Sequence, residues 1–248
     1  MAFLMQFHRQ CCYKTWIKSN HNIQHADKMG INLGDIFPNF KAETSKGPIQ
    51  FHDWIGDKWA ILFSHPADYT PVCTTELGKL VQLLPEFEKR NVKLIALSCD
   101  SVQDHIGWSK DIQSFKGGEG DFPCPIIADE KRELAVQMGM LDPVEKDKKG
   151  QPLTCRAFFI ISPDKKLKMS ALYPATTGRN FNEILRIVDS LQLTAHKKVA
   201  TPADWEMGKE CMVIPSVSPE EAKTLFPKHR VVDVPSKKGY LRFTPQPE

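Results

Sequence analysis

Short apolar runs alternate with longer amphipathic stretches in the middle of the chain. The runs "WAILF" (59–63) and "VKLIALS" (92–98) are bounded by polar or turn residues, as strands buried on both faces of a parallel sheet would be. Between them an apolar stripe recurs at steps of three and four residues: Leu77, Leu80, Val81, Leu84 and Phe87. Polar positions lie mostly off this stripe: Glu76, Lys79, Glu86 and Lys89. The pattern predicts a β-α-β unit.

The next segments extend this layered pattern. Ser101, with Asp104 three residues later, is typical of a helix start and predicts a helix over 102–115. A strand at 125–129 and a helix at 130–138 follow, and then a hairpin formed by 156–162 and 167–173. A further apolar stripe predicts a helix through Ile184, Leu185, Ile187, Val188 and Leu191. A β-α-β unit followed by β-β-α predicts an α/β, thioredoxin-like layer fold.

The two ends of the chain differ from this central part. After Leu193 proline becomes frequent and periodicity is lost, which predicts a small, irregular C-terminal domain or arm over 194–248. In residues 1–29 three basic residues precede Asp27, the first acid, as in a mitochondrial presequence, yet arginine and serine are scarce. A transit segment and a disordered basic extension both remain open. The main domain is expected over 30–193.

Composition and charge narrow the class of protein. With 41% hydrophobic and 25% charged residues the chain is typical of a globular protein, and a net charge of +3 gives no argument for a nucleic-acid partner. No stretch of about 18 apolar residues predicts an integral membrane segment. The seven cysteines form no C-x-x-C pair, which favours a reducing compartment. We expect a cytoplasmic protein, or a mitochondrial one if residues 1–28 act as a transit segment.

The candidate nucleophile is a cysteine at the start of the first long helix. Thr70 and Pro71 form a helix-start signal that makes Thr70 the N-cap and places Cys73 at the third helical position. A threonine hydroxyl, free backbone N–H groups and the helix dipole there favour a thiolate. The other cysteines of the main and C-terminal parts are expected to be structural thiols: Cys99, Cys124, Cys155 and Cys211. Cys155 adjoins Arg156, but neighbours on a strand point to opposite faces.

The spacing of Pro66, Thr70 and Cys73 resembles the P-x-x-x-T-x-x-C peroxidatic motif of the peroxiredoxins. The segments "LIALSCDSVQDHIGWSKDI", "YPATTGRNFNEILR" and "ATPADW" resemble the one-cysteine, peroxiredoxin-6-like subgroup of that family. In that subgroup Arg156 matches the second member of the active site. The resemblance implies a thioredoxin-like fold with a small C-terminal peroxiredoxin domain, and a homodimer.

The resemblance also implies the chemistry. Cys73 would attack a peroxide and become a sulfenic acid, with hydrogen peroxide and organic or phospholipid hydroperoxides as substrates in antioxidant defence. Thr70 would orient the peroxide, Arg156 would stabilise charge on the thiolate and the leaving oxygen, and Pro66 would shield the site from water. His65 is a candidate for a hydrogen bond to the peroxide or to the oxidised sulfur, or simply ends a strand.

No second cysteine has the context of a resolving cysteine. Cys211 comes after Trp205, lies in "KECMVIP" and is expected to be structural. The resemblance therefore implies an external thiol as reductant, glutathione delivered by a glutathione transferase, and no bound cofactor. A metal site built from His52, His65 and Cys73 is disfavoured because their spacings match no compact ligand set.

A second activity of the subgroup, a phospholipase, is expected to be absent. The histidine and aspartate of that site match His52 and Asp164, but "GDKWA" has Lys58 in place of the nucleophilic serine and Ala60 in place of a glycine. The alternative to a peroxidase is a redox-sensing or chaperone-like thioredoxin-fold binding protein whose cysteine is oxidised without turnover.

Overall fold

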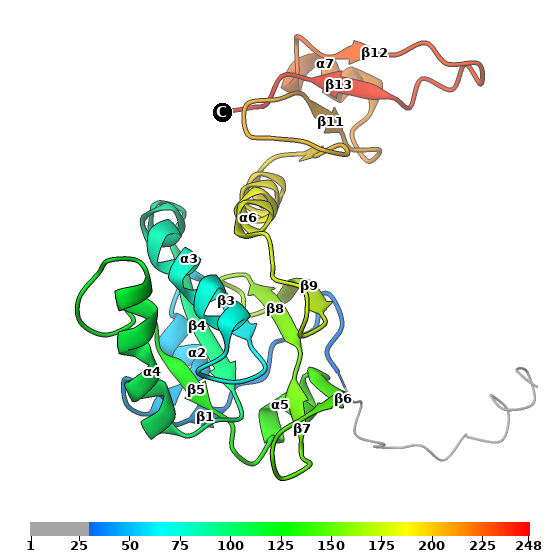
Figure 1. Ribbon diagram of the computed structural model, residues 1–248. Coiled ribbons are helices and arrows are strands. Elements are labelled where there is room, and N and C mark those ends of the chain that lie inside the picture. The colour runs from blue at the N-terminus through cyan, green and yellow to red at the C-terminus, as the bar shows by residue number, and fades with distance from the viewer. Residues whose placement is uncertain (1–29) are drawn as a thin grey trace, which may run out of the picture.

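The computed structural model describes residues 30–248, so the N-terminal extension expected over 1–29 lies outside the described residues. Its centre is a five-stranded sheet in the order β5-β4-β3-β8-β9 (Figure 1). These strands are β3 (Trp59–Ser64), β4 (Val92–Ser98), β5 (Ile126–Ala128), β8 (Arg156–Ile161) and β9 (Leu167–Tyr173). β3, β4 and β5 run parallel, whereas β8 is antiparallel to both β3 and β9.

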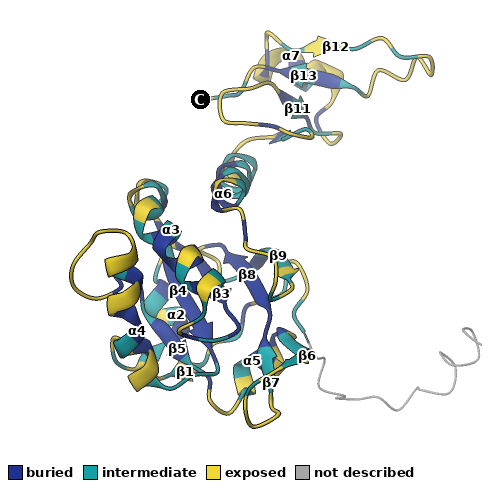
Figure 2. Cartoon of the chain, in the orientation of Figure 1, coloured by how far each residue is buried: buried dark blue, intermediate teal, exposed yellow. Residues whose placement is uncertain are grey.

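Helices cover both faces of this sheet. They are α2 (Phe51–Ile55), α3 (Pro71–Lys89), α4 (Val102–Phe115), α5 (Glu133–Gln137) and α6 (Phe181–His196). Residues 59, 61 and 63 of β3 pack with α3, α4 and α6, and residues 60 and 62 pack with α2 and α5, because side chains alternate along a strand. Figure 2 shows the sheet as the buried centre of this layered domain.

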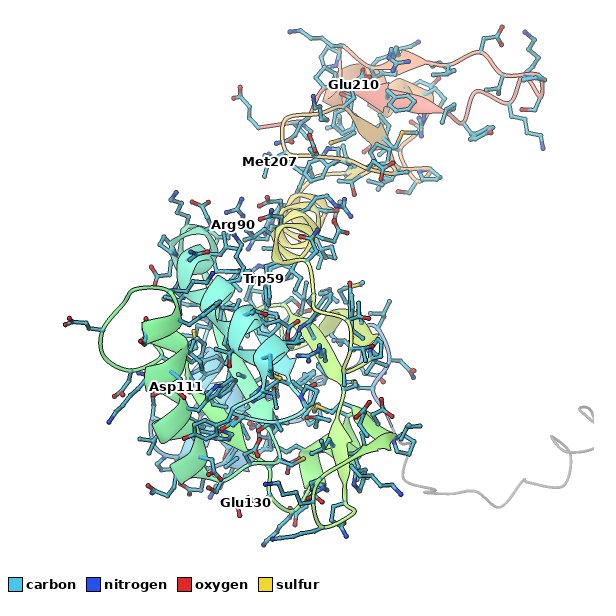
Figure 3. All side chains as sticks on the ribbon, in the orientation of Figure 1. Trp59, Arg90, Asp111, Glu130, Met207 and Glu210 are labelled. Atoms are coloured by element: carbon cyan, nitrogen blue, oxygen red, sulfur yellow. The ribbon has the colours of Figure 1, made fainter. Side chains whose placement is uncertain are left out.

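The predicted α/β, thioredoxin-like architecture is confirmed, including the β-α-β unit and the hairpin of β8 and β9. The start of α4 is also confirmed, because Ser101 and Asp104 form a capping box at its first turn. Arg90 (labelled in Figure 3) directly follows the last residue of α3. Its Nε lies 2.5 Å from Oδ1 of Asp189 in α6, and this ion pair joins α3 to α6.

Several short elements carry no sequence pattern that predicted them. They are β1 (Lys41–Ala42), β2 (Ile49–Gln50), β6 (Leu141–Lys146), β7 (Pro152–Thr154) and α2. β1 pairs with β2 and β6 with β7 as separate two-stranded sheets. These segments are too short to display a period and contain no continuous apolar run, so only their partners in the fold make them regular.

The C-terminal part has its own sheet and core. Its elements are β10 (Val199–Ala200), β11 (Cys211–Val213), α7 (Pro219–Leu225), β12 (Arg230–Val231) and β13 (Arg242–Thr244). The strands pair in the order β10-β11-β13-β12, and Trp205 and Cys211 lie in a small buried cluster. Figure 1 shows this sheet beyond α6, apart from the central sheet. Residues 194–248, expected to be irregular, therefore contain a folded sheet. The domain boundary expected between residues 193 and 194 falls in the last turn of α6 and stays a prediction.

Within residues 30–248, none of the helices combines the length and apolarity needed to cross a membrane.

Candidate active site

Cys73 lies where β3 has ended and α3 begins. The helix starts at Pro71 with Thr70 at the N-cap position, so Cys73 occupies the third helical position, as the sequence predicted. Its side chain is fully buried in the core between α3, α4 and the sheet. The sulfur therefore combines the amide-rich start of a helix with a surrounding that excludes bulk water.

The hydroxyl of Thr70 hydrogen-bonds to a backbone carbonyl. Thr70 has extended backbone, and its side chain makes no capping bond to α3; instead Oγ1 donates to the carbonyl of Ala67 at 2.8 Å. Tyr69 stands between them in the left-handed region, with φ 54°, and the turn brings Ala67 O within reach of the hydroxyl. Thr70 is therefore the N-cap residue by position, as the sequence predicted, but without a side-chain cap, and its oxygen keeps lone pairs that can accept a hydrogen bond.

Arg156 is brought to Cys73 from the far end of the chain. β8 runs antiparallel to β3, so the first residue of β8 lies at the end of β3 from which the chain leads into α3. The Arg156 Nη1 group donates to Cys73 Sγ at 3.3 Å, while Nε and Nη2 both donate to Ala175 O, at 2.9 and 2.6 Å. The guanidinium is thereby held in one orientation against the sulfur.

Two further charged residues complete this cluster. Glu76 Oε2 accepts from Arg156 Nη1 at 2.9 Å and from Arg179 Nη2 at 2.8 Å, and its Oε1 accepts from the backbone N–H and Nε of Arg179. Burial raises the pKa of Glu76, but the charge and hydrogen bonds of Arg179 and the charge of Arg156 outweigh it and hold that pKa below its usual range. Two arginines and one carboxylate leave one positive charge beside Cys73 Sγ.

The sequence pattern placed Glu76 on the polar face of the helix and did not single out Arg179. In the structure both are buried. A signal for Glu76 was present, because it comes three residues after Cys73 on a helix and residues three apart share a face. No comparable local signal exists for Arg179, which reaches the site from the loop before α6.

His65 and Pro66 follow directly after β3, and both are buried. His65 Nε2 lies 2.7 Å from Asp68 Oδ1, and the other carboxylate oxygen lies 2.6 Å from Nδ1 of His105 in α4. Burial raises the pKa of Asp68, but the hydrogen bonds from His105 and His65 outweigh it and hold that pKa below its usual range. No pattern in the sequence selects Asp68 or His105.

Only one group in the described part of the chain has atoms close enough together to share a metal ion: His65, Asp68 and Asp100. Of the three residues weighed from the sequence it includes His65 but not His52 or Cys73. Asp100 Oδ2 accepts from the Asp68 backbone N–H at 2.9 Å and from Ser98 Oγ at 2.7 Å. The three side chains are therefore parts of a hydrogen-bond network, which explains their proximity without a metal.

The other cysteines of the described chain are unsuited to act as nucleophiles. Burial raises the pKa of Cys99 and of Cys124 to about 12 and that of Cys155 to about 11, and it also raises the pKa of Cys211. Cys155 packs on the opposite side of the sheet from Cys73, as strand alternation predicted. These thiols stay protonated at neutral pH.

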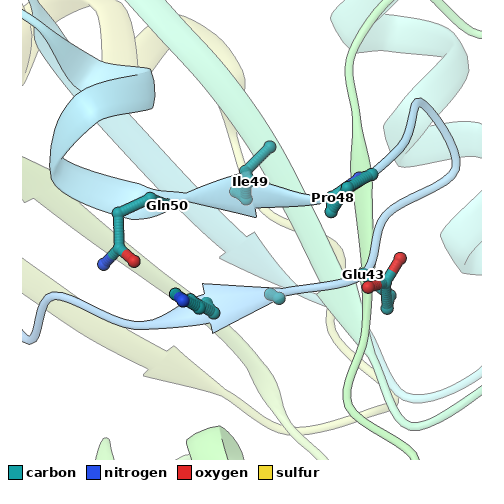
Figure 4. A pocket seen from close by; sticks show the side chains of 6 residues that line it. Glu43, Pro48, Ile49 and Gln50 are labelled. Carbon is teal, nitrogen blue, oxygen red and sulfur yellow. The ribbon is translucent and has the colours of Figure 1, made fainter.

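The residues that match a phospholipase site are differently engaged. His52 Nε2 lies 2.7 Å from the carbonyl of Phe37, and Asp164 accepts from Ser162 Oγ and pairs with Lys166 at 3.4 Å. Lys58 is exposed. The pocket drawn in Figure 4, at the two-stranded sheet of β1 and β2, is lined by another set of residues: Lys41, Ala42, Glu43, Pro48, Ile49 and Gln50. It contains none of the candidate site residues.

Both parts of the chain are similar to known proteins. Residues 33–170 match the AhpC/TSA family, and residues 190–229 match the C-terminal domain of 1-Cys peroxiredoxin. The chain is 65% identical to Peroxiredoxin-6 of Gallus gallus over 222 residues and 62% identical to Peroxiredoxin-6 of Homo sapiens over 221 residues. Each alignment covers 88% of this chain and 99% of the relative.

Two solved structures are similar over most of the chain. Peroxiredoxin 6 of Arenicola marina superposes with a TM-score of 0.87 at 66% identity, covering 88% of this chain and 100% of that one. A yeast mitochondrial 1-Cys peroxiredoxin, described as resolved through glutathione/thioredoxin systems, superposes with a TM-score of 0.80 at 42% identity, covering 87% and 99%.

Proposed function

Because the chain belongs to the AhpC/TSA family, in its one-cysteine peroxiredoxin branch, and is a thiol peroxidase of antioxidant function, we propose that Cys73 is its peroxidatic nucleophile. The observation that carries this proposal is the 3.3 Å contact of Arg156 Nη1 with Cys73 Sγ at the start of α3. The substrates proposed are hydrogen peroxide and organic or phospholipid hydroperoxides.

In the proposed reaction the Cys73 thiolate attacks the terminal oxygen of the peroxide. An S–O bond forms, the O–O bond breaks, and the departing oxygen takes a proton to leave as water or an alcohol. The thiolate sulfur is thereby oxidised to a sulfenic acid. The O–H of Thr70 already donates a hydrogen bond to Ala67 O, so in this scheme Oγ1 accepts a hydrogen bond from the peroxide O–H. Buried Pro66 keeps water from the sulfur.

The role of Arg156 follows from a count of its donors. Among residues 30–248, four of its five N–H groups have partners: Cys73, Glu76 and two contacts with Ala175 O. The remaining Nη2 N–H is free to stabilise the negative charge that develops on the departing oxygen. The contact with Ala175 and Glu76 holds the guanidinium in place while the charge moves.

An external thiol returns Cys73 to its reduced state in this proposal. The first thiol displaces water from the sulfenic acid to form a mixed disulfide, and a second thiol releases Cys73. Cys211 is fully buried in the C-terminal core with a raised pKa, which argues against a resolving role. We infer that glutathione is the reductant, in line with the glutathione/thioredoxin systems named for the yeast relative, with a glutathione transferase as partner.

Assembly and location are parts of the same proposal. Peroxiredoxins are typically oligomeric, and we infer a homodimer for this chain. A cytoplasmic location is proposed, with a mitochondrial one as the alternative if residues 1–28 are a transit segment, as one of the similar structures is of a mitochondrial protein.

We expect pure protein to reduce hydrogen peroxide continuously when glutathione and a glutathione transferase are supplied. Peroxide loss is followed together with oxidised glutathione, and one disulfide should form per peroxide consumed. A single stoichiometric oxidation without turnover, under glutathione and equally under thioredoxin, would favour the redox-sensing or chaperone-like alternative. Turnover with thioredoxin alone would keep the peroxidase and replace the reductant.

Phospholipase activity is expected to be absent. Lys58 has no hydroxyl for acyl transfer, and His52 Nε2 is engaged with the carbonyl of Phe37. Fatty-acid release from phospholipid vesicles should not exceed that of a His52→Ala variant, with peroxidase activity of the same preparation showing that the protein is folded. Release that disappears in His52→Ala would contradict this prediction.

A further inference from the structure

A buried carboxylate lies between two buried histidines next to the candidate active site. The side chains of His65 and His105 are fully buried, and that of Asp68 is 1% exposed. Asp68 Oδ1 lies 2.7 Å from His65 Nε2, and Oδ2 lies 2.6 Å from His105 Nδ1. On its other edge His105 Nε2 lies 3.1 Å from the carbonyl of Ile127. The network joins the end of β3 to α4 and β5.

The protons of His105 can be assigned from its partners. The carbonyl of Ile127 only accepts hydrogen bonds, so His105 Nε2 must carry a proton. The ionised carboxylate of Asp68 also only accepts, so His105 Nδ1 must carry a second proton. His105 is therefore an imidazolium, and its positive charge balances that of Asp68.

His65 has the opposite character. Its Nε2 donates to Asp68, and its Nδ1 is buried without a hydrogen-bond partner among the residues that the structure describes. A proton on Nδ1 would place a second positive charge there with no acceptor, which is far more costly than an unused lone pair. His65 is thus neutral, and Nδ1 is a preformed acceptor.

This acceptor lies close to the turn that holds the candidate nucleophile. The ring of His65 packs on Trp108, with 5.1 Å between the centroids, and Trp108 Nε1 donates to Oγ1 of Thr74, the residue after Cys73. Trp108 and Cys73 belong to the same buried cluster. The ring of His65 therefore packs against the same buried cluster that contains Cys73.

We propose that His105 is a positioning residue that carries the positive charge facing Asp68, so that His65 stays neutral and offers Nδ1 to the second O–H of a hydrogen peroxide molecule at Cys73. The inference rests on the proposed function of Cys73. The carboxylate of Asp100 comes within 4.8 Å of His65 and Asp68, but it is partly exposed and accepts from Ser98 Oγ and from the backbone N–H of Asp68, so solvent and its own donors stabilise its charge. Removing the charge from His105 should transfer it to His65.

A His105→Asn variant tests this transfer. The asparagine amide can still donate to Asp68, but it carries no charge, so the buried carboxylate should recruit a proton onto His65 Nδ1. The acceptor then becomes a donor, and we expect the rate of Cys73 oxidation by hydrogen peroxide to fall about tenfold. Stopped-flow fluorescence gives the rate, mass spectrometry identifies the oxidised cysteine, and ¹⁵N NMR reports the protonation of each histidine.

A double variant separates a charge effect from simple structural damage. In Asp68→Asn with His105→Asn the carboxylate is gone, and the amide carbonyl introduced in its place can still accept from His65 Nε2, so His65 should return to neutral. We expect the rate to recover to within about threefold of the unmodified protein. A merely structural role predicts a double variant slower than the single one. His196→Asn, on the exposed last turn of α6, is the matched control and should behave like the unmodified protein.

The unmodified protein gives a test that does not depend on folding of a variant. At neutral pH its ¹⁵N spectrum should show His105 protonated on both nitrogens and His65 with one unprotonated nitrogen. A neutral His105, an unchanged rate in His105→Asn, or a double variant slower than the single variant would overturn the inference. If peroxide oxidises the unmodified protein without modifying Cys73, the proposed function itself fails and the inference falls with it.

Discussion

Replacing Cys73 with serine is expected to lower the rate of peroxide reduction by about a thousandfold or more. A serine hydroxyl keeps nearly the same shape but stays protonated beside Arg156, so no nucleophile is available to attack the O–O bond. The rate is measured as peroxide consumption with excess thiol. A circular dichroism spectrum that matches the unmodified protein shows that the loss is chemical.

The matched controls are the other cysteines of the described chain. Cys99→Ser and Cys211→Ser should retain turnover, because burial keeps these thiols protonated and neither has a place in the proposed reaction. Substantial turnover in Cys73→Ser would refute the assignment of the nucleophile. Loss of turnover in Cys211→Ser, with oxidation of Cys73 intact, would show that a resolving cysteine exists after all.

Replacing Glu76 with glutamine is expected to lower the free energy of unfolding by about 3 kcal/mol and peroxidase activity by about tenfold or more. The carboxylate faces both Arg156 and Arg179, and a neutral amide leaves two buried positive charges without their counterion. The NH₂ group of the glutamine would also face an arginine N–H group, and two donors cannot bond to each other. Arg156 would then lose its fixed orientation against Cys73. Denaturant unfolding and the rate of Cys73 oxidation measure the two effects.

The pH dependence of the stability difference between the unmodified protein and Glu76→Gln tests whether the charge of Glu76 causes it. The pKa of Glu76 is lowered in the folded protein, so the stability from its ionised form is present above the unfolded value of about 4.5 and is lost as pH falls through the folded value. The gap between the unmodified protein and Glu76→Gln should therefore shrink in acid. Glu88→Gln, at an exposed position of the same helix, should unfold like the unmodified protein at every pH. A gap that does not change with pH would point to packing instead of charge.

Most of the central fold was predictable because its helices show an apolar period and its strands are mostly continuous apolar runs. The strands at 59–63 and 92–98 and the helix between them appear nearly at the expected bounds. The short strands β1, β2, β6 and β7 were not predictable, because, unlike β3, they contain no continuous apolar run bounded by turn residues. The same holds for the C-terminal sheet, whose strands of two or three residues become regular only when they pair.

The features of the candidate active site also divide into those that the sequence predicted and those that it did not. Pro66, Thr70 and Cys73 form a local motif, and the position of Cys73 on the helix followed from Thr70 and Pro71 alone. The direction of the Thr70 hydroxyl did not, because a turn through Tyr69 offers it the carbonyl of Ala67. Glu76 was assigned to solvent because charged side chains on a helix are usually exposed, and only the approach of two arginines makes its burial favourable.

The sequence by itself determined the layered fold, the helix start that holds Cys73 and the absence of a serine at position 58. Those features depend on residues close together in the chain, where spacing and local chemistry decide the outcome. The tertiary structure decided the electrostatics of the site. Arg156, Arg179 and His105 arrive from β8, a loop and α4, and the protonation of a buried group depends on the charges that surround it, which only the folded chain brings together.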